Sequence, residues 1–177
     1  MKTNLTKKQV SSLTSKDGLK PALNGLYYEP NKKRLTATNG HALISYKVES
    51  CENESTAVIP TEVFKTKAKD NCKYNINGEA SRISDEGKAN YNLIDEQYPD
   101  VDSVQPSYDN SIEYGVNLEL LKKLCDAVPK DSNNHKFIKL TINLDRNDTA
   151  IKFKQYSNAD EDSLYSGLIM PIRIESK

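Results

Sequence analysis

The sequence predicts an α+β fold in which one short helix and a few antiparallel strands occur three times along the chain. Helix start signals occur near residues 6, 60 and 117, and each is followed by strand patterns separated by polar turns. The three rounds are spaced by roughly 55 residues, which is typical of a structural repeat. A chain of 177 residues is long enough to bury a core without disulfides or metals.

The first round begins at Thr6-Lys7-Lys8-Gln9, where the Thr and Gln side chains match a capping box. Val10 and Leu13, three residues apart, give this helix its buried side. Strands are predicted at 26–29, 34–38 and 41–48. Asn39-Gly40 is predicted to form a two-residue type I′ turn, because both residue types tolerate a positive φ.

The second round starts with a short strand at 57–60 that leads through Pro60 into a helix at 61–65. Further strands are predicted at 73–76, 79–84 and 88–94. Residues 95–110 are rich in Asp, Pro and Ser, which indicates a linker.

The third round contains the clearest helix, which Asn117 caps. Its apolar stripe has the spacing i, i+3, i+4, i+7 and consists of Leu121, Leu124, Cys125 and Val128. Strands are predicted at 137–144, 149–155 and 164–174, with an acidic tip at 158–162.

Charge and cysteine content exclude several classes of protein. The 25 basic and 25 acidic residues cancel, so any nucleic-acid contact must come from a local patch. Three widely spaced cysteines without a Cys-x-x-Cys pair predict reduced thiols, with neither a disulfide framework nor a zinc site. The polar N-terminal residues and the lack of a run of about 18 apolar residues predict a cytoplasmic protein that makes no membrane contact.

Lysines lie on the polar side of each predicted helix. On one concave surface they would contact DNA phosphates without reading bases. The alternative is that lysine serves here as a solvated helix former. The candidate DNA-binding residues are Lys7, Lys8, Lys65, Lys67, Lys69, Lys122 and Lys123.

Neither a catalytic residue nor a cofactor is predicted, so the chain is expected not to be an enzyme. His41 lies beside a tight turn without a Ser or Cys nucleophile nearby in the sequence, which favours a role in the turn over a hydrolase site. A second candidate site is an acidic cluster that consists of Asp95, Glu96, Asp100 and Asp102. Its spacing matches no EF-hand loop, so no metal site is predicted, and the cluster is interpreted as a solvated linker.

The chain resembles the bacterial DNA polymerase III beta sliding-clamp family in four places that follow the same order, and the first place comprises two neighbouring segments. Residues 22–29 and 35–43 are similar to its middle domain, where the second stretch usually reads Ala-Thr-Asp-Gly-His-Arg-Leu. Residues 57–60 resemble the family's Val-Ile-Val-Pro. Residues 92–100 resemble Leu-Ile-Asp-Gly-x-Phe-Pro-Asp, and residues 168–174 resemble Val-Met-Pro-Met-Arg-Leu.

The resemblance implies a DNA-clamp fold built from half-domains. It implies a complete clamp-type domain at 1–105, with half-domains at about 1–50 and 56–105, and a half-domain at 111–177 similar to the C-terminal half of the third clamp domain. The family's rings contain more half-domains than this chain supplies, so a homo-oligomer is expected.

The resemblance also implies a processivity or scaffold protein that holds double-stranded DNA loosely and docks linear motifs of DNA polymerases and repair factors in a hydrophobic pocket. The positions that resemble this pocket are Leu23, Thr38, Gly40, His41, Leu43, Pro99, Val104, Asn117, Leu120, Leu168, Met170, Pro171, Ile172 and Arg173. Two alternatives remain open. The leucines among them are ordinary core residues, or the chain is a peptide-binding clamp mimic or competitor that does not encircle DNA.

Overall fold

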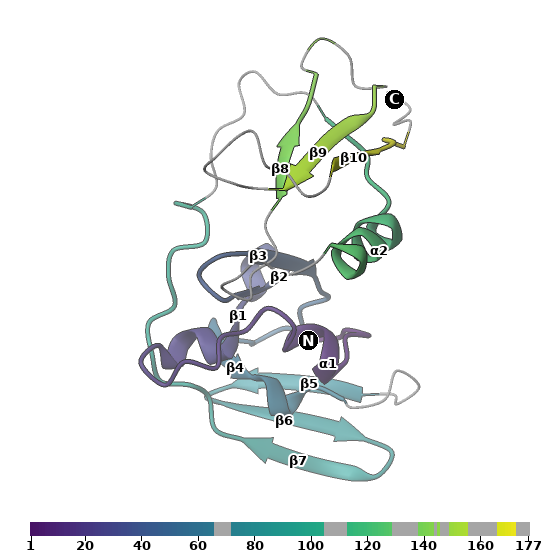
Figure 1. Ribbon diagram of the computed structural model, residues 1–177. Coiled ribbons are helices and arrows are strands. Elements are labelled where there is room, and N and C mark those ends of the chain that lie inside the picture. Colours follow the sequence, from purple (N-terminus) through teal and green to yellow (C-terminus); the bar gives the residue numbers. More distant parts are fainter. Residues whose placement is uncertain are drawn as a thin grey trace. The chain divides into compact units, whose positions relative to one another are not determined.

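The computed structural model describes residues 1–65, 72–104, 113–128, 138–143, 145, 149–155 and 166–172. Contacts divide the chain into two compact units, Met1–Pro106 (unit 1) and Ser107–Lys177 (unit 2). Unit 1 contains short helices beside antiparallel sheets, and the described part of unit 2 contains a helix beside an antiparallel sheet, which confirms the α+β prediction (Figure 1). No helix among the described residues is long and apolar enough to cross a membrane.

Among the described residues of unit 1, the strands form two sheets, in the orders β3-β2-β1-β4 and β5-β6-β7. Every pairing within them is antiparallel. The elements are α1 (Lys7–Val10), η1 (Pro21–Asn24), β1 (Gly25–Glu29), η2 (Pro30–Lys32), β2 (Arg34–Thr38), β3 (Leu43–Lys47), β4 (Ala57–Pro60), η3 (Thr61–Val63), β5 (Cys72–Asn77), β6 (Glu79–Ser84) and β7 (Gly87–Tyr91).

The four-stranded sheet of unit 1 buries side chains on both faces. Leu26 and Tyr28 of β1 point into the main core with Phe64 and Ile76. Strand alternation turns Tyr27 to the other face, where it packs in a second cluster. That cluster also contains Ala22, Leu23, Val58, Ile94, Tyr98 and Val101. Both faces are therefore covered, the second one by η1 and by the segment that follows β7.

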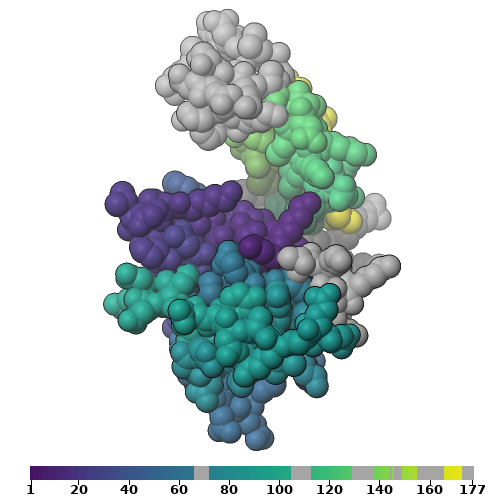
Figure 2. Space-filling model, turned by 90° about the horizontal axis from the view of Figure 1, so that it is seen from below, coloured from purple at the N-terminus to yellow at the C-terminus, as the bar shows by residue number. Residues whose placement is uncertain are grey.

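The N-terminal residues are integrated into unit 1 rather than lying on its surface. Thr6 caps α1 by the predicted capping box with Gln9. Met1 is fully buried, and its ammonium group donates to the carbonyl oxygen of Tyr74 at 2.8 Å and pairs with the carboxylate of Glu54. Figure 2 shows the N-terminal residues (purple) in contact with the teal residues of the second half of the unit.

Each of the three rounds closes in the same way. The segment before each helix forms an antiparallel bridge with the segment after the third strand of that round. These bridges join Lys2 to Glu49, Val58 to Ile94, and Gly115 to Ile172. The three rounds thus share one pattern of closure, as repeats of one structural unit would.

The described part of unit 2 contains one longer helix and one sheet. The elements are α2 (Leu118–Ala127), β8 (Ile138–Thr141), β9 (Ile151–Gln155) and β10 (Ser166–Ile169), with strand order β10-β9-β8. Asn117 caps α2 as predicted, because its Oδ1 accepts from the N–H groups of Glu119 at 2.8 Å and Leu120 at 3.4 Å.

The core of unit 2 lies between α2 and one face of its sheet. Ile151, Phe153 and Ile169 are buried there, with Leu121 and Leu124 packed against them. Cys125, which the apolar spacing placed in the same stripe, is exposed. The sequence-predicted acidic tip at 158–162 lies outside the described residues.

Three predictions of local structure are wrong. A type I′ turn at Asn39-Gly40 requires two positive φ angles, whereas only Gly40 has one (87°), and residues 39–42 form a four-residue loop. The helix at 61–65 is a single 3₁₀ turn, because Phe64 is extended and Lys65 bridges to Thr6. The predicted linker is packed structure in its described part, since Tyr98 and Val101 are buried; residues 105–110 lie outside that part.

Candidate peptide-binding surfaces

A cavity of about 300 Å³ opens on unit 1 between the β2–β3 loop and the segment after β7. It is lined by Leu23, Thr38, Gly40, His41, Ala42, Leu43, Tyr98, Pro99, Asp100, Val101 and Val104. All seven unit 1 residues that the resemblance assigned to a pocket are in this set. A mostly apolar lining with a few polar groups is typical of a ligand-binding groove.

The β2–β3 loop forms the first wall and is held by its own side chains. The hydroxyl of Thr38 donates to the Ala42 carbonyl at 2.7 Å and accepts from the Gly40 N–H at 3.1 Å. The Asn39 Oδ1 accepts from the N–H groups of His41 and Ala42, at 3.0 Å each. These bonds fix the backbone that presents His41 and Leu43 to the cavity.

The second wall is the segment from Tyr98 to Val104, which Tyr98 fastens to the sheet. Its ring stacks on Tyr27, with centroids 5.0 Å apart and planes within 6°. Its hydroxyl donates to the carbonyl oxygen of Thr36 at 3.4 Å. Burial raises the pKa of Tyr98 to about 12, so the phenol is neutral at physiological pH.

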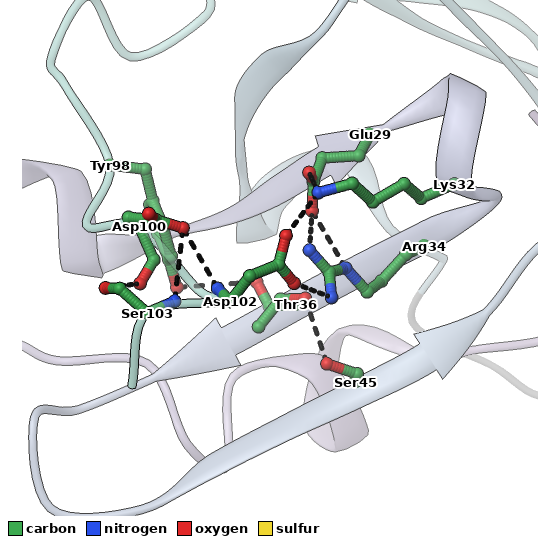
Figure 3. A network of polar contacts seen from close by, with 9 residues as sticks. All are labelled: Glu29, Lys32, Arg34, Thr36, Ser45, Tyr98, Asp100, Asp102 and Ser103. Atoms are coloured by element: carbon green, nitrogen blue, oxygen red, sulfur yellow. Dashed lines mark hydrogen bonds and ion pairs between the residues drawn. The ribbon is translucent and has the colours of Figure 1, made fainter. Parts of the chain in front are cut away.

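Asp102 joins the second wall to the start of β2 through a network of ion pairs (Figure 3). The Nη1 of Arg34 donates to Asp102 at 2.8 Å, and the Nζ of Lys32 donates to the other carboxylate oxygen at 2.5 Å. Glu29 orients Arg34 by accepting from its Nε at 2.8 Å. Hydrogen bonds from Arg34 and then Lys32 lower the pKa of Asp102 to about 2.

Sequence reasoning missed this network. The interpretation of Asp102 as part of a solvated linker is wrong, because its carboxylate pairs with Lys32 and Arg34. Asp100 also has a structural role, because its Oδ1 accepts from the N–H groups of Asp102 and Ser103 at 3.0 and 3.4 Å. The turn formed by Asp100 is visible as an Asx pattern, but the pair between Asp102 and Arg34 joins residues far apart in sequence and leaves no local signal.

Unit 2 presents its own exposed apolar strip along β10 and the residues after it. Leu168, Met170 and Ile172 alternate along the chain, and their exposed fractions are 65%, 60% and 52%. Pro171 is half-buried, and Leu120 is exposed in the first turn of α2, next to the cap residue Asn117. Arg173, the last of the pocket residues implied by the resemblance, lies outside the described residues.

The predicted DNA-facing lysines do not share one environment. Lys8, Lys122 and Lys123 are exposed. Lys7 pairs with Glu62, with 3.4 Å between the ammonium nitrogen and the carboxylate oxygen. Lys65 is only 3% exposed, so the prediction that it faces solvent is wrong. Its burial follows from the bridge to Thr6. Lys67 and Lys69 lie outside the described residues.

No family model and no curated protein matches this sequence. Solved structures of bacterial sliding clamps do match. The DNA polymerase sliding clamp from Pseudomonas aeruginosa is 14% identical with a TM-score of 0.66, and the match covers 94% of this chain and 50% of the clamp. The Helicobacter pylori beta clamp bound to a DNA ligase peptide is 18% identical with a TM-score of 0.60, covering 96% and 48%.

A third match is the sliding clamp from Bartonella birtlesii bound to griselimycin, which is 17% identical with a TM-score of 0.65. That match covers 98% of this chain and 48% of the clamp. This chain thus spans about half the length of the clamps that it matches. It has the fold of the bacterial DNA polymerase III beta sliding clamp over that half.

Proposed function

We propose that this chain is a sliding-clamp-like scaffold or processivity protein, without catalytic activity, that docks short linear segments of DNA polymerases or repair factors. The observation that carries the proposal is the cavity of unit 1, which gathers all seven of the pocket positions assigned to that unit. The clamp from Helicobacter pylori that shares this fold binds a DNA ligase peptide. Unit 2 offers an apolar surface of its own in the exposed strip of Leu168, Met170 and Ile172.

The test is binding of a fluorescein-labelled DNA ligase peptide, followed by fluorescence anisotropy. Leu43→Asp places a charge in the cavity wall and is expected to weaken binding at least tenfold, since apolar anchors dominate such interfaces. Ile83→Asp on β6 is the matched control, because Ile83 is 43% exposed against 37% for Leu43 and does not line this cavity. Equal affinities of the two variants for the peptide would contradict the proposal.

A second candidate function is peptide docking by a clamp mimic that does not encircle DNA. This candidate is favoured by the surroundings of two candidate DNA-binding lysines, because Lys65 is buried and Lys7 is ion-paired to Glu62. Weak positive charge gives little non-specific hold on phosphates. Reversing Lys122 and Lys123 to Glu is expected to reduce duplex binding if the chain is a DNA clamp, and to leave it unchanged if the chain is a mimic.

A ring around DNA needs more half-domains than this chain supplies, and we propose that further copies provide them. Light scattering after size-exclusion chromatography measures the mass directly. A closed oligomer that is retained on circular DNA and lost from linear DNA is expected for the clamp. A strict monomer at high concentration, with peptide binding intact, would favour the mimic.

A further inference from the structure

The first two rounds of the chain exchange segments within unit 1. β4, which precedes the helical turn of the second round, pairs with β1 of the first round, so that Ala57 lies opposite Tyr28. The exchange is reciprocal, because Met1 at the start of the first round pairs with Tyr74 of β5 in the second. The Tyr74 N–H donates to the Met1 carbonyl at 3.1 Å, and the Met1 ammonium group donates to the Tyr74 carbonyl at 2.8 Å. Each round thus contributes the segment before its helix to the first strand of the other round.

This exchange accompanies complete burial of the first strand in each round of unit 1. The core-facing side chains of β1, Leu26 and Tyr28, have no exposed surface. Those of β5, Tyr74 and Ile76, are 3% and 0% exposed. The contributed segment covers the outer edge of the first strand, where unpaired backbone groups would otherwise be open to other chains.

The described part of unit 2 contains the same elements once. β8 is its first strand and pairs with β9 on one side, and no strand among the described residues pairs with the other side (Figure 1). Leu140 of β8 lies opposite the buried Phe153, which places Leu140 on the core side of the sheet. Leu140 is nevertheless 48% exposed, and Ile142, two residues further on, is 39% exposed. The first strand of unit 2 therefore leaves apolar surface open that its counterparts in unit 1 bury.

The segment that would cover such an edge is also present in unit 2. Gly115, just before α2, forms an antiparallel bridge with Ile172. Val58 of β4 forms the equivalent bridge in unit 1. The bridge occupies one side of the segment, because the Ile172 N–H donates to the Gly115 carbonyl at 2.8 Å. Neighbouring residues of an extended chain point their backbone groups to opposite sides, so Val116 turns its N–H and C=O away from Ile172.

We propose that two copies of this chain pair through unit 2, and that each copy contributes residues 113–116 to the outer edge of β8 in the other copy. A twofold axis makes this contact self-complementary, because each copy gives one segment and receives one. The pairing repeats between two chains the exchange that unit 1 makes within one chain, and it covers Leu140 and Ile142. The inference rests on the further copies proposed above and identifies the surface that joins them.

The mass of the assembly is the first test. Light scattering after size-exclusion chromatography is expected to give an even number of copies for the wild-type chain. Leu140→Asp places a carboxylate in the contact twice, and it is expected to raise the dissociation constant of the pair by at least about thirtyfold. Ile83→Asp on β6 of unit 1 is the matched control, because Ile83 is 43% exposed, and it is expected to keep the wild-type mass. A Leu140→Asp chain that keeps the wild-type mass overturns the inference.

Photo-crosslinking locates the contact without a charge in the core. p-Benzoylphenylalanine at Thr141, an exposed position of β8, is expected to form adducts of twice the chain mass that map to residues 113–117 of the second copy. Adducts confined to one chain would assign the edge of β8 to another segment of the same chain. Adducts on unit 1 of a second copy would assign the assembly to a different surface. Either result overturns the inference.

The failures of the two proposals are distinguishable, because peptide docking in the unit 1 cavity needs no second copy. A monomer that binds the DNA ligase peptide overturns this inference and leaves the docking function in place. An assembly that crosslinks through residues 113–117 but does not bind the peptide overturns the docking function and supports the inference.

Discussion

Replacement of Tyr98 tests whether the second wall of the unit 1 cavity is held by packing. The ring of Tyr98 is buried in the second cluster and stacks on Tyr27. Removal of a buried aromatic ring costs about 3 to 5 kcal/mol, so Tyr98→Ala is expected to reduce the free energy of unfolding of unit 1 by about 3 kcal/mol. The hydroxyl contributes much less, because its bond to the Thr36 carbonyl is long at 3.4 Å. Tyr98→Phe is therefore expected to cost less than about 1 kcal/mol.

Urea titration followed by far-ultraviolet circular dichroism measures both variants. With an m value of about 2 kcal/mol per molar, a loss of about 3 kcal/mol lowers the midpoint by about 1.5 M. Amide hydrogen exchange should accelerate at residues 99–104 in Tyr98→Ala and stay close to wild type in Tyr98→Phe. If Tyr98→Phe is as destabilising as Tyr98→Ala, the hydrogen bond holds the wall and the packing argument is refuted. A stable Tyr98→Ala variant would show that this segment is not part of the folded unit.

Three further predictions concern the same structure. Burial raises the pKa values of Tyr74 and Tyr98 to about 12, so the folded state favours the neutral phenol at both residues. The free energy of unfolding is therefore expected to fall as the pH rises from about 10 to 12. Urea midpoints at several pH values would show this fall, and it should be less steep in Tyr74→Phe. Asp102→Asn should leave the fold intact but weaken peptide binding and accelerate amide hydrogen exchange at residues 99–104. A wild-type affinity for the peptide would contradict the role of Asp102 in positioning the second wall. Gly167→Ala should destabilise unit 2 by about 1 to 3 kcal/mol, because the added Cβ would lie 2.7 Å from Cε1 of Phe153. Thermal unfolding measures this loss. An unchanged melting temperature would show that the ring of Phe153 can move aside.

Local chemistry was sufficient to predict much of the fold. The side chains of Thr6 and Asn117 satisfy backbone donors within three residues, so the starts of α1 and α2 can be identified from short motifs. The strands at 34–38 and 57–60 coincide with β2 and β4, because turn residues bound them on both sides. Repetition of the same order of elements predicted the three rounds.

Long-range contacts explain why several predictions made from the sequence are wrong. Lys65 is buried because it forms an isolated bridge with Thr6, and no pattern near Lys65 indicates that. The segment after β7 looks like a linker by composition, yet Tyr98 and Val101 find their partners in β1 and η1. Asp102 binds Arg34, which lies far away in the sequence.

The candidate site was accessible from the sequence only in part. The residues of the β2–β3 loop and of the second wall were identified by resemblance, and the structure of unit 1 brings them to one cavity. Which residue of β9 lies opposite Leu168 could not be predicted, because that depends on the register between β9 and β10. Register is set by the pairing of whole strands and not by any single residue.

Photo-crosslinking tests the central claim most directly. A DNA ligase peptide that carries a benzophenone side chain at successive positions would be irradiated with the chain, and the adducts would be mapped by mass spectrometry. We expect adducts at the cavity residues Leu43 and Val104 of unit 1, with competition by unlabelled peptide. Competed adducts confined to the sheet β5-β6-β7, with none at these two residues, would contradict the account.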